Sequence, residues 1–437
     1  MKKNIKIYLL FLISLIIISI TSQVDLDGIW GYGFCYNISQ GLLPYKDFNM
    51  VIGPLYPLLF SIPMHLFGNY YYLFELEHCI IYAFIFTLIY NRIGKKAIYI
   101  LLIYGACLTI FGYNLFCVMM MLTILVLLDS KIKYKDIILG ILIGIILMIK
   151  HNIGLFLLLV YIYDNRKKLY NLLSVLVPIV PILIYLLINN LFDKYIDFCF
   201  LGMGNFLSNL STDFMSVIPY VLLMIPLIKD FIKNKKIKAL YVIVFQIIVF
   251  PIFDQGHIIP GLIPVVYYYL SENICTKKFL FLMKYFIIIG FIVTAILKSF
   301  LECNFILDNN YLKYQFLRRD VSTYLESYSE YIDRLENDNA DVYLLIDNAY
   351  IVRLYRNEKP SFYDLINRGN LGSNEEKYID MMDDNCKDKK CYYILDYYFF
   401  HTRLFDQRND LFKNYVLDNG KYIEDLPSGD KLYINNN

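Results

Sequence analysis

Long apolar segments recur along the first 300 residues of the chain, and short loops rich in lysine and arginine separate them. A helix needs about 20 apolar residues to cross the hydrocarbon core of a bilayer, and about 17–25 are tolerated. The segments therefore predict about eleven membrane-spanning helices, several of them short. They are expected near residues 5–22, 71–91, 97–112, 114–128, 137–150, 152–163, 169–190, 214–229, 239–253, 257–271 and 279–300.

Composition divides the chain into two parts. Hydrophobic residues make up 58% of the sequence and charged residues 18%, whereas soluble domains carry about 25% charged residues. These values exclude a wholly soluble enzyme and a disordered chain. Residues 1–300 carry 24 Lys and Arg against 14 Asp and Glu, and residues 301–437 carry 17 against 25. We expect an α-helical polytopic membrane domain over 1–304 and a small extracytoplasmic α/β domain over 305–437.

The basic residues predict the orientation of the membrane domain. The first 20 residues resemble a signal peptide, but no small-residue cleavage site follows, so we expect an uncleaved first span. With a cytoplasmic N-terminus, the outer loops hold only Lys46, Lys150 and Lys194. The cytoplasmic loops then hold Lys2, Lys3, Lys6, Arg92, Lys95, Lys96, Lys131, Lys133, Lys135, Arg166, Lys167, Lys168, Lys229, Lys233, Lys235, Lys236, Lys238, Lys277 and Lys278. The positive-inside rule therefore predicts a multi-pass cell-membrane protein with an odd number of spans and an external C-terminal domain.

The first outer loop, residues 23–70, contains an apolar stretch that we do not expect to cross the membrane. A crossing at 48–68 would move every later loop to the opposite side. The stretch also contains Pro54, Pro57 and Pro63, which favour an interfacial or re-entrant segment over a straight helix. Just before it, Trp30, Phe34 and Ile38 recur every four residues and predict an apolar helix stripe lying in the lipid interface.

The C-terminal part has the pattern of a small α/β domain. Short apolar runs at 341–347 and 391–396 are typical of buried strands, and the turn signal at 427–430 predicts a hairpin. Helices are expected at 311–335 and 375–382. Cys386 and Cys391 can form a disulfide in an external domain, but two free thiols are an equal alternative. None of the nine cysteines belongs to a CxxC pair, which excludes a zinc ribbon or thioredoxin motif.

Three polar clusters fall on the predicted outer face. Asp25, Asp27 and Asp47 lie in the first outer loop, where the two earlier residues can equally be helix caps and Asp47 a turn residue. The other clusters are Lys150-His151-Asn152 and Asp254 with His257; Glu75, Glu77 and His78 can join them or be exposed at the interface. A snorkelling lysine explains Lys150 but not its neighbours. Ionisable groups at membrane depth are functional by default, so we interpret the clusters together.

Carboxylate, lysine and histidine side chains together can bind an anionic group and move a proton. A lipid-linked phosphate with its head group at the outer face meets both conditions. In that interpretation Lys150 and the histidines hold the phosphate, and an aspartate takes the proton of an acceptor hydroxyl.

Three motifs, in the same order along the chain, resemble those of GT-C glycosyltransferases. The first motif is Asp27 followed by Gly41-Leu-Leu-Pro44-Tyr45-Lys-Asp47-Phe48 and Gly53-Pro54-Leu55-Tyr56. The second is Lys150-His151-Asn152-Ile153-Gly154, and the third is Pro251-Ile-Phe-Asp254-Gln-Gly-His257. The chain is similar to bacterial relatives of the dolichyl-phosphate-mannose protein mannosyltransferases and to the lipid A aminoarabinose transferases. The resemblance spans residues 1–300 and extends to an outer α/β domain.

The resemblance implies sugar transfer from a polyprenyl-phosphate donor to a lipid, glycan or protein acceptor. It implies Asp27 as the base, Asp25 or Asp47 as reserves, and substrate or phosphate binding by Tyr45, Lys150, His151, Asn152, Asp254 and His257. Relatives have an Asp-Glu pair where this chain has Asp25-Leu-Asp27-Gly28. The resemblance therefore leaves open which aspartate is the base and whether a divalent metal is required.

Three other functions are compatible with part of this pattern. Internal repeats and charges within the spans are typical of a transporter or flippase of lipid-linked saccharide. In this chain the charges instead cluster on one face. A surface-glycan polymerase or ligase shares the substrate and the topology, but its large late outer loop is missing, since residues 191–213 are modest in length. A non-catalytic scaffold is permitted by the acidic C-terminal part. The basic loops set topology, so membrane lipids are expected partners and nucleic acid is not.

Overall fold

The computed structural model describes most of the chain. Outside the described residues lie positions 1, 22–25, 108–110, 167, 207–210, 213, 251, 254, 275–302, 307–308, 310–311, 313–314, 337–339, 347–348, 367–368, 398–409 and 436–437. The expected span at 279–300, Asp25 and Asp254 therefore fall outside the description.

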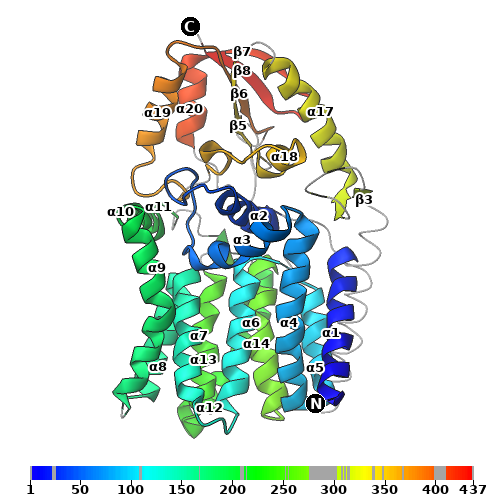
Figure 1. Ribbon diagram of the computed structural model, residues 1–437, viewed down its shortest axis with the longest axis vertical. Coiled ribbons are helices and arrows are strands. Elements are labelled where there is room, and N and C mark those ends of the chain that lie inside the picture. Colours follow the sequence, from blue (N-terminus) through cyan, green and yellow to red (C-terminus); the bar gives the residue numbers. More distant parts are fainter. Residues whose placement is uncertain are drawn as a thin grey trace.

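The lower part of the molecule is a bundle of helices lying side by side (Figure 1). Each expected span up to residue 271 contains one of its helices, because long apolar runs with few charges suit a buried or lipid-facing helix. The helices are α1 (Lys2–Thr21), α4 (Tyr71–Ile93), α5 (Ala97–Gly105), α6 (Tyr113–Leu128), α7 (Lys135–Ile149), α8 (His151–Asp164), α9 (Leu176–Ile188), α12 (Phe214–Asn234), α13 (Ile237–Phe245) and α14 (Gln255–Ser271).

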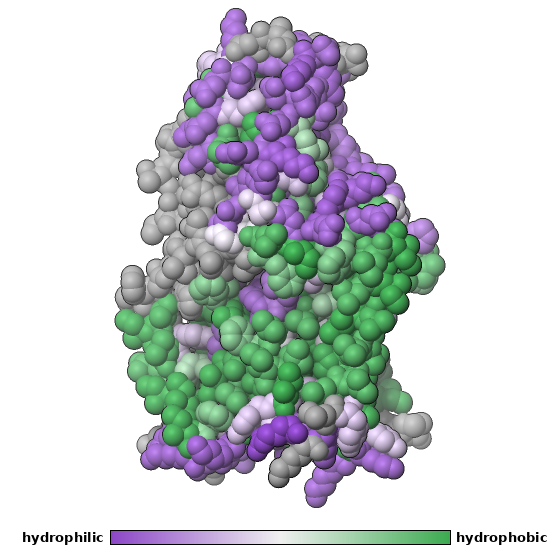
Figure 2. All heavy atoms as spheres, turned by 90° about the vertical axis from the view of Figure 1, so that its left-hand side faces the viewer, coloured by the Kyte–Doolittle hydropathy of each residue, from purple (hydrophilic) through white to green (hydrophobic). Residues whose placement is uncertain are grey.

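Three helical stretches among the described residues are long and apolar enough to cross a membrane: Lys3–Thr21, Tyr71–Gly105 and Tyr170–Ile188. Shorter apolar helices accompany them, such as Tyr113–Leu128 and His151–Asp164. Figure 2 shows hydrophobic residues over the bundle, with hydrophilic residues at its lower end and over the upper part of the molecule. The chain is thus a mainly helical, membrane-associated protein.

The segment expected to be the first outer loop, residues 23–70, contains two short helices at the upper end of the bundle, α2 (Leu26–Ser39) and α3 (Leu55–Phe67) (Figure 1). The expected lipid-facing stripe on α2 is wrong for Phe34. Its ring is 2% exposed and contacts Phe48 and Tyr350, with centroid distances of 6.1 and 6.0 Å. A Cβ on Gly33 would collide with the Tyr350 ring, so α2 packs closely beneath the C-terminal part. A long-range aromatic contact, invisible to helix periodicity, takes the place of lipid.

The upper part contains a four-stranded sheet in the order β5-β6-β8-β7. Its strands are β5 (Asp341–Leu345), β6 (Cys391–Leu395), β7 (Gly420–Asp425) and β8 (Lys431–Asn435). β5 and β6 are parallel, and β8 pairs antiparallel with β6 and β7. The two buried strands and the hairpin therefore lie where the sequence indicates them. In Figure 1, α19 (Glu376–Cys386) and α20 (Asp410–Asn419) lie on one side of the sheet and α17 (Arg319–Glu336) on the other.

The remaining elements of this part join the sheet to the bundle. A strand pair, β3 (Cys303–Ile306) with β4 (Gln315–Arg318), comes first, so the helix expected from residue 311 begins only at Arg319. α18 (Ala349–Tyr355) carries Tyr350 onto α2. Cys386 and Cys391 form a disulfide that links the end of α19 to the start of β6.

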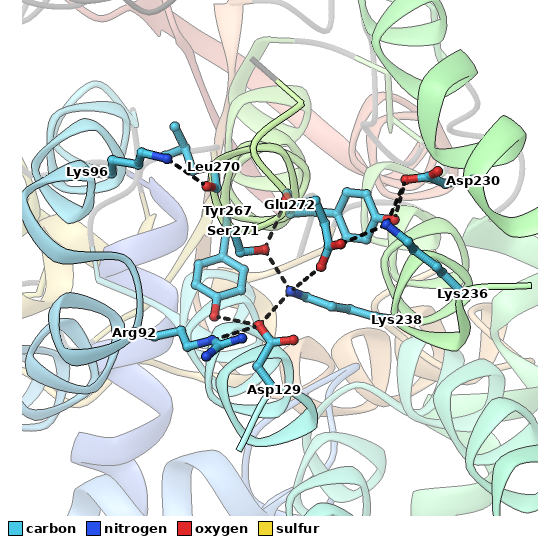
Figure 3. A network of polar contacts seen from close by, with 11 residues as sticks. Arg92, Lys96, Asp129, Asp230, Lys236, Lys238, Tyr267, Leu270, Ser271 and Glu272 are labelled. Atoms are coloured by element: carbon cyan, nitrogen blue, oxygen red, sulfur yellow. Dashed lines mark hydrogen bonds and ion pairs between the residues drawn. The ribbon is translucent and has the colours of Figure 1, made fainter. Parts of the chain in front are cut away.

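Ion pairs tie four helix ends together at the lower end of the bundle (Figure 3). The Lys238 ammonium at the start of α13 lies 2.6 Å from Asp129, after α6, and 3.2 Å from Glu272, after α14. Arg92 of α4 lies 3.3 Å from Asp129, and Lys236 lies 2.8 Å from Glu272. The N-terminus lies at the same end (Figure 1). The beginnings of α6 and α14 are therefore at the opposite, upper end.

Candidate functional site

The first outer loop is docked on the end of α7. The Gly53 backbone N–H donates to the Ile149 carbonyl oxygen at 2.8 Å. A Cβ at position 53 would collide with the Met148 carbonyl oxygen, so only glycine allows this approach. The loop motif around Gly53-Pro54 and the cluster that begins at Lys150, far apart in the sequence, thus meet at one point.

Lys150 separates α7 from α8, and its side chain reaches the start of α6. Its Nζ donates to Asn114 Oδ1 at 2.7 Å and lies 5.8 Å from the centroid of the Tyr113 ring. Asn152 accepts a hydrogen bond from the Ile153 backbone N–H at 2.8 Å. Gly154 lets α8 approach α7, because a Cβ there would collide with the Leu147 backbone. The motif therefore combines a tight helical hairpin with a cation at its apex.

His151 carries a buried nitrogen without a described hydrogen-bond partner beside that cation. Its ring lies 4.5 Å, centroid to centroid, from the Phe200 ring. Its Nδ1 is buried and has no hydrogen-bond partner among the residues that the structure describes. Since buried polar atoms are normally hydrogen-bonded, this unsatisfied nitrogen marks His151 as a candidate ligand contact.

The start of α2 lies on the same cluster. Asp27 is in the first turn of α2, and the structure describes only its backbone. Gly31 follows one turn later, and a Cβ there would lie 3.6 Å from the Tyr56 hydroxyl and 3.7 Å from Gly112 Cα. Gly112 directly precedes Tyr113 and Asn114, the two contacts of Lys150. Residues 112–114 thus join the first half of α2 to the lysine.

Glu77 of α4 supplies a second carboxylate that faces α2. Burial, and then the negative charge of Glu77, raise the pKa of the Cys35 thiol well above its ordinary value. Positions 27, 31 and 35 are four residues apart and share one side of the helix. Glu77 Oε2 is buried with no partner among the described residues. The sequence marks Glu77 only as one of three polar residues at the end of a span.

Its two neighbours have structural roles. Glu75 is 4% exposed and accepts a hydrogen bond from the Ser19 hydroxyl of α1 at 2.8 Å. His78 is fully buried; its Nε2 lies 3.1 Å from the Tyr56 hydroxyl and its Nδ1 2.8 Å from the Phe74 carbonyl oxygen. Interface exposure, the alternative considered for these residues, is therefore wrong for Glu75 and His78.

Tyr45 and Asp47 shape the outer loop. Tyr45 is 1% exposed, and its hydroxyl donates to the Ile52 carbonyl oxygen at 2.5 Å. The exposed Asp47 side chain accepts a hydrogen bond from the Leu43 backbone N–H at 2.7 Å. These contacts favour a structural role for both residues, and for Asp47 they match its interpretation as a turn residue.

The structure describes only one residue of the third polar cluster, which consists of Asp254 and His257. His257 is half-buried in the first turn of α14, at the upper end of the bundle. Asp254 lies outside the described residues. Within the part of the chain that the structure describes, no three His, Cys, Asp or Glu residues gather as a metal site would require.

No protein-family model matches the chain, and a search of curated proteins found no match either. Functional interpretation therefore depends on the motifs and on the geometry of the upper end of the bundle.

Proposed function

We propose that the chain is a membrane glycosyltransferase of the GT-C type, which transfers a sugar from a polyprenyl-phosphate donor to an acceptor hydroxyl at the outer membrane face. The observation that carries this proposal is the hydrogen bond between Gly53 and Ile149. It brings the loop that follows the acidic start of α2 against the helix end that carries Lys150 and His151. A carboxylate, a cation and an unsatisfied imidazole nitrogen on segments that meet at one end of the bundle suit a phosphate-linked substrate.

In the proposed reaction Asp27 removes the proton of the acceptor hydroxyl as its oxygen bonds to the anomeric carbon. The bond from that carbon to the phosphate oxygen breaks, and the polyprenyl phosphate leaves with the electron pair. Lys150, His151 and His257 bind the phosphate and stabilise its added charge. Glu77 is the second candidate base, because it faces the same side of α2.

The proposal includes about eleven spans, a cytoplasmic N-terminus and an extracytoplasmic α/β domain. The basic loops gathered at the lower end support this orientation, since cytoplasmic loops are enriched in lysine and arginine. The disulfide between Cys386 and Cys391 supports an external C-terminal part, because disulfides persist in oxidising compartments.

Asp27→Asn tests the role of the base. Asparagine keeps the size of the side chain and can still cap a helix, so the protein should fold and reach the membrane at a normal level. Sugar transfer from a polyprenyl-phosphate donor by the purified protein should fall at least ~100-fold, the low end for losing a general base. Asp388→Asn is the matched control, because it makes the same substitution at an exposed position of the C-terminal part. Near-normal turnover of Asp27→Asn would refute its role and direct attention to Asp25 or Glu77.

A further inference from the structure

A cleft lies between the membrane part and the C-terminal part, and its lining residues do not include those of the Lys150 cluster. It has a volume of about 290 Å³, close to the lower end of the range for small-ligand sites, about 300–1,000 Å³. Three separate segments line it: Tyr45 and Lys46 of the first outer loop, residues 193–198, and residues 362–381. We call it the lysine cleft after Lys46, Lys194 and Lys377.

The walls of the cleft are fixed to one another. Asp197 accepts hydrogen bonds from the Ser373 backbone N–H, at 3.0 Å, and from the Ser373 hydroxyl. The Asn205 amide donates to the Gly372 carbonyl oxygen at 3.3 Å. A Cβ on Gly202 would lie 2.8 Å from Gly372, so the two parts touch without space for a side chain. The cleft is thus a formed site.

Its three ammonium groups have no ion pair or hydrogen bond among the described residues. Burial, followed by the positive charges of Lys377 and Lys46, lowers the pKa of Lys194 and outweighs the negative charge of Asp47, which raises it. The nearby carboxylates form no ion pair with these lysines among the described residues; Asp197 instead accepts hydrogen bonds from Ser373, and Asp47 accepts one from Leu43. Asp193 adds the one remaining lining carboxylate in the described cleft. Like charges held together without matched partners favour an anionic ligand.

Aromatic rings form one wall of the cleft. Phe362 and Tyr378 are stacked with centroids 4.7 Å apart, and Phe198 meets both rings edge-on at 6.2 and 6.3 Å. Phe362 is the most accessible of the three rings. An aromatic surface beside a few charged groups suits a ligand with an apolar ring face and an anionic substituent.

We infer that the lysine cleft binds an anionic saccharide, one that carries phosphate or carboxylate groups, as a free glycan or as the head group of a glycolipid. The lysines hold the anionic groups, and Phe362 packs against the sugar ring. This binding claim is independent of catalysis. The further step, that the saccharide is the acceptor of the transfer reaction, depends on the function proposed above.

Binding of phosphorylated mannopentaose to the purified full-length protein tests the inference, with neutral mannopentaose and inorganic phosphate as comparison probes. The wild type should bind the phosphorylated sugar at least ~10-fold more tightly than either comparison probe. Replacing Lys46, Lys194 and Lys377 together by Gln should weaken that binding at least ~10-fold. Replacing Lys131, Lys233 and Lys235 by Gln is the matched control, because it removes the same charge from exposed lysines at the lower end.

Phe362→Ala should weaken binding of the phosphorylated sugar and leave binding of inorganic phosphate unchanged. Equal affinity for the phosphorylated and neutral sugars, or equal loss in the two triple variants, would overturn the inference. Selective loss of binding to phosphatidylglycerol vesicles, with sugar binding intact, would assign the cleft to lipid instead. Asp27→Asn should keep full affinity for the sugar, so failure of the catalytic proposal can be told apart from failure of this one.

Discussion

Lys150 is the residue at which the parts of the candidate site meet. Its ammonium contacts Asn114 at the start of α6, and the residue before it in the chain, Ile149, accepts the hydrogen bond of Gly53. Neighbouring His151 adds a buried nitrogen without a described partner. A cation fixed at this junction of distant segments is what a phosphate site requires.

Lys150→Met keeps the length of the side chain and removes its charge. If Lys150 holds the donor phosphate, kcat/KM for the donor should fall roughly 10–100-fold, because a hydrogen bond to a charged group contributes about 1.5–3 kcal/mol. Steady-state transfer assays over a range of donor concentrations measure this change. Lys131→Met, the same substitution at an exposed site of the lower end, should leave kcat/KM unchanged. A Lys150→Met protein with wild-type kcat/KM would rule out the phosphate role.

At the scale of elements, the lower-end ion pairs fix how the helices of the bundle are arranged. Lys238 is 7% exposed and contacts both Asp129 and Glu272, so it joins the ends of α6 and α14 to the start of α13. Burial raises the pKa of Glu272, but hydrogen bonds and charges from Lys236 and Lys238 outweigh it and hold that pKa below its ordinary value of 4.5. The folded protein therefore favours the charged form of Glu272.

This shift gives a pH dependence with a defined sign. Because the pKa of Glu272 is lowered by folding, its contribution to stability is fully present above pH 4.5 and is lost as the pH falls through the folded-state value. The thermal unfolding midpoint in detergent should therefore drop as the pH falls below about 4.5. Glu272→Gln should lower the midpoint at neutral pH and make the acid drop smaller. Glu376→Gln, at an exposed helix position, should follow the wild-type curve; an acid drop of equal size in Glu272→Gln would contradict the argument.

At the scale of the whole molecule, an apolar bundle separates two polar ends of different character. The lower end carries the basic loops and the ion pairs, and the upper end carries the outer loop, the candidate site and the sheet (Figures 1 and 2). The lysine cleft lies where the sheet-containing part meets the outer loop. If both sites act together, donor lipid and acceptor reach the protein at the same end.

Cysteine labelling from outside intact cells tests this orientation. Lys235→Cys at the lower end should stay unlabelled by a membrane-impermeant maleimide, and Asp380→Cys on α19 should be labelled, because both positions are exposed in the fold. Cys275 and Cys303 are first replaced by Ser; the free cysteines at positions 35, 79, 107, 117 and 199 are buried, and Cys386 and Cys391 are bonded to each other. Permeabilised cells should label both sites. Labelling of both sites in intact cells would refute the topology and, with it, an outward-facing active site.

The sequence by itself determined the features that depend on neighbouring residues. Apolar runs predict helices up to residue 271 because a helix in lipid satisfies its own backbone hydrogen bonds. The strands β5 and β6 and the β7–β8 hairpin follow from short apolar runs and a turn signal, and they lie where expected. The motif residues around Gly53 and Lys150 also stand out locally, although nothing in the sequence shows that they touch.

Only the tertiary structure decided which distant segments meet. It placed Phe34 under Tyr350 instead of in lipid, placed Glu77 near Cys35 of α2, and left Tyr45 and Asp47 with structural contacts. It also assembled the lysine cleft from three segments that are far apart in the chain. Periodicity reports which face of a helix is apolar but not what covers that face, because the partner is chosen by packing and by hydrogen bonds between distant segments.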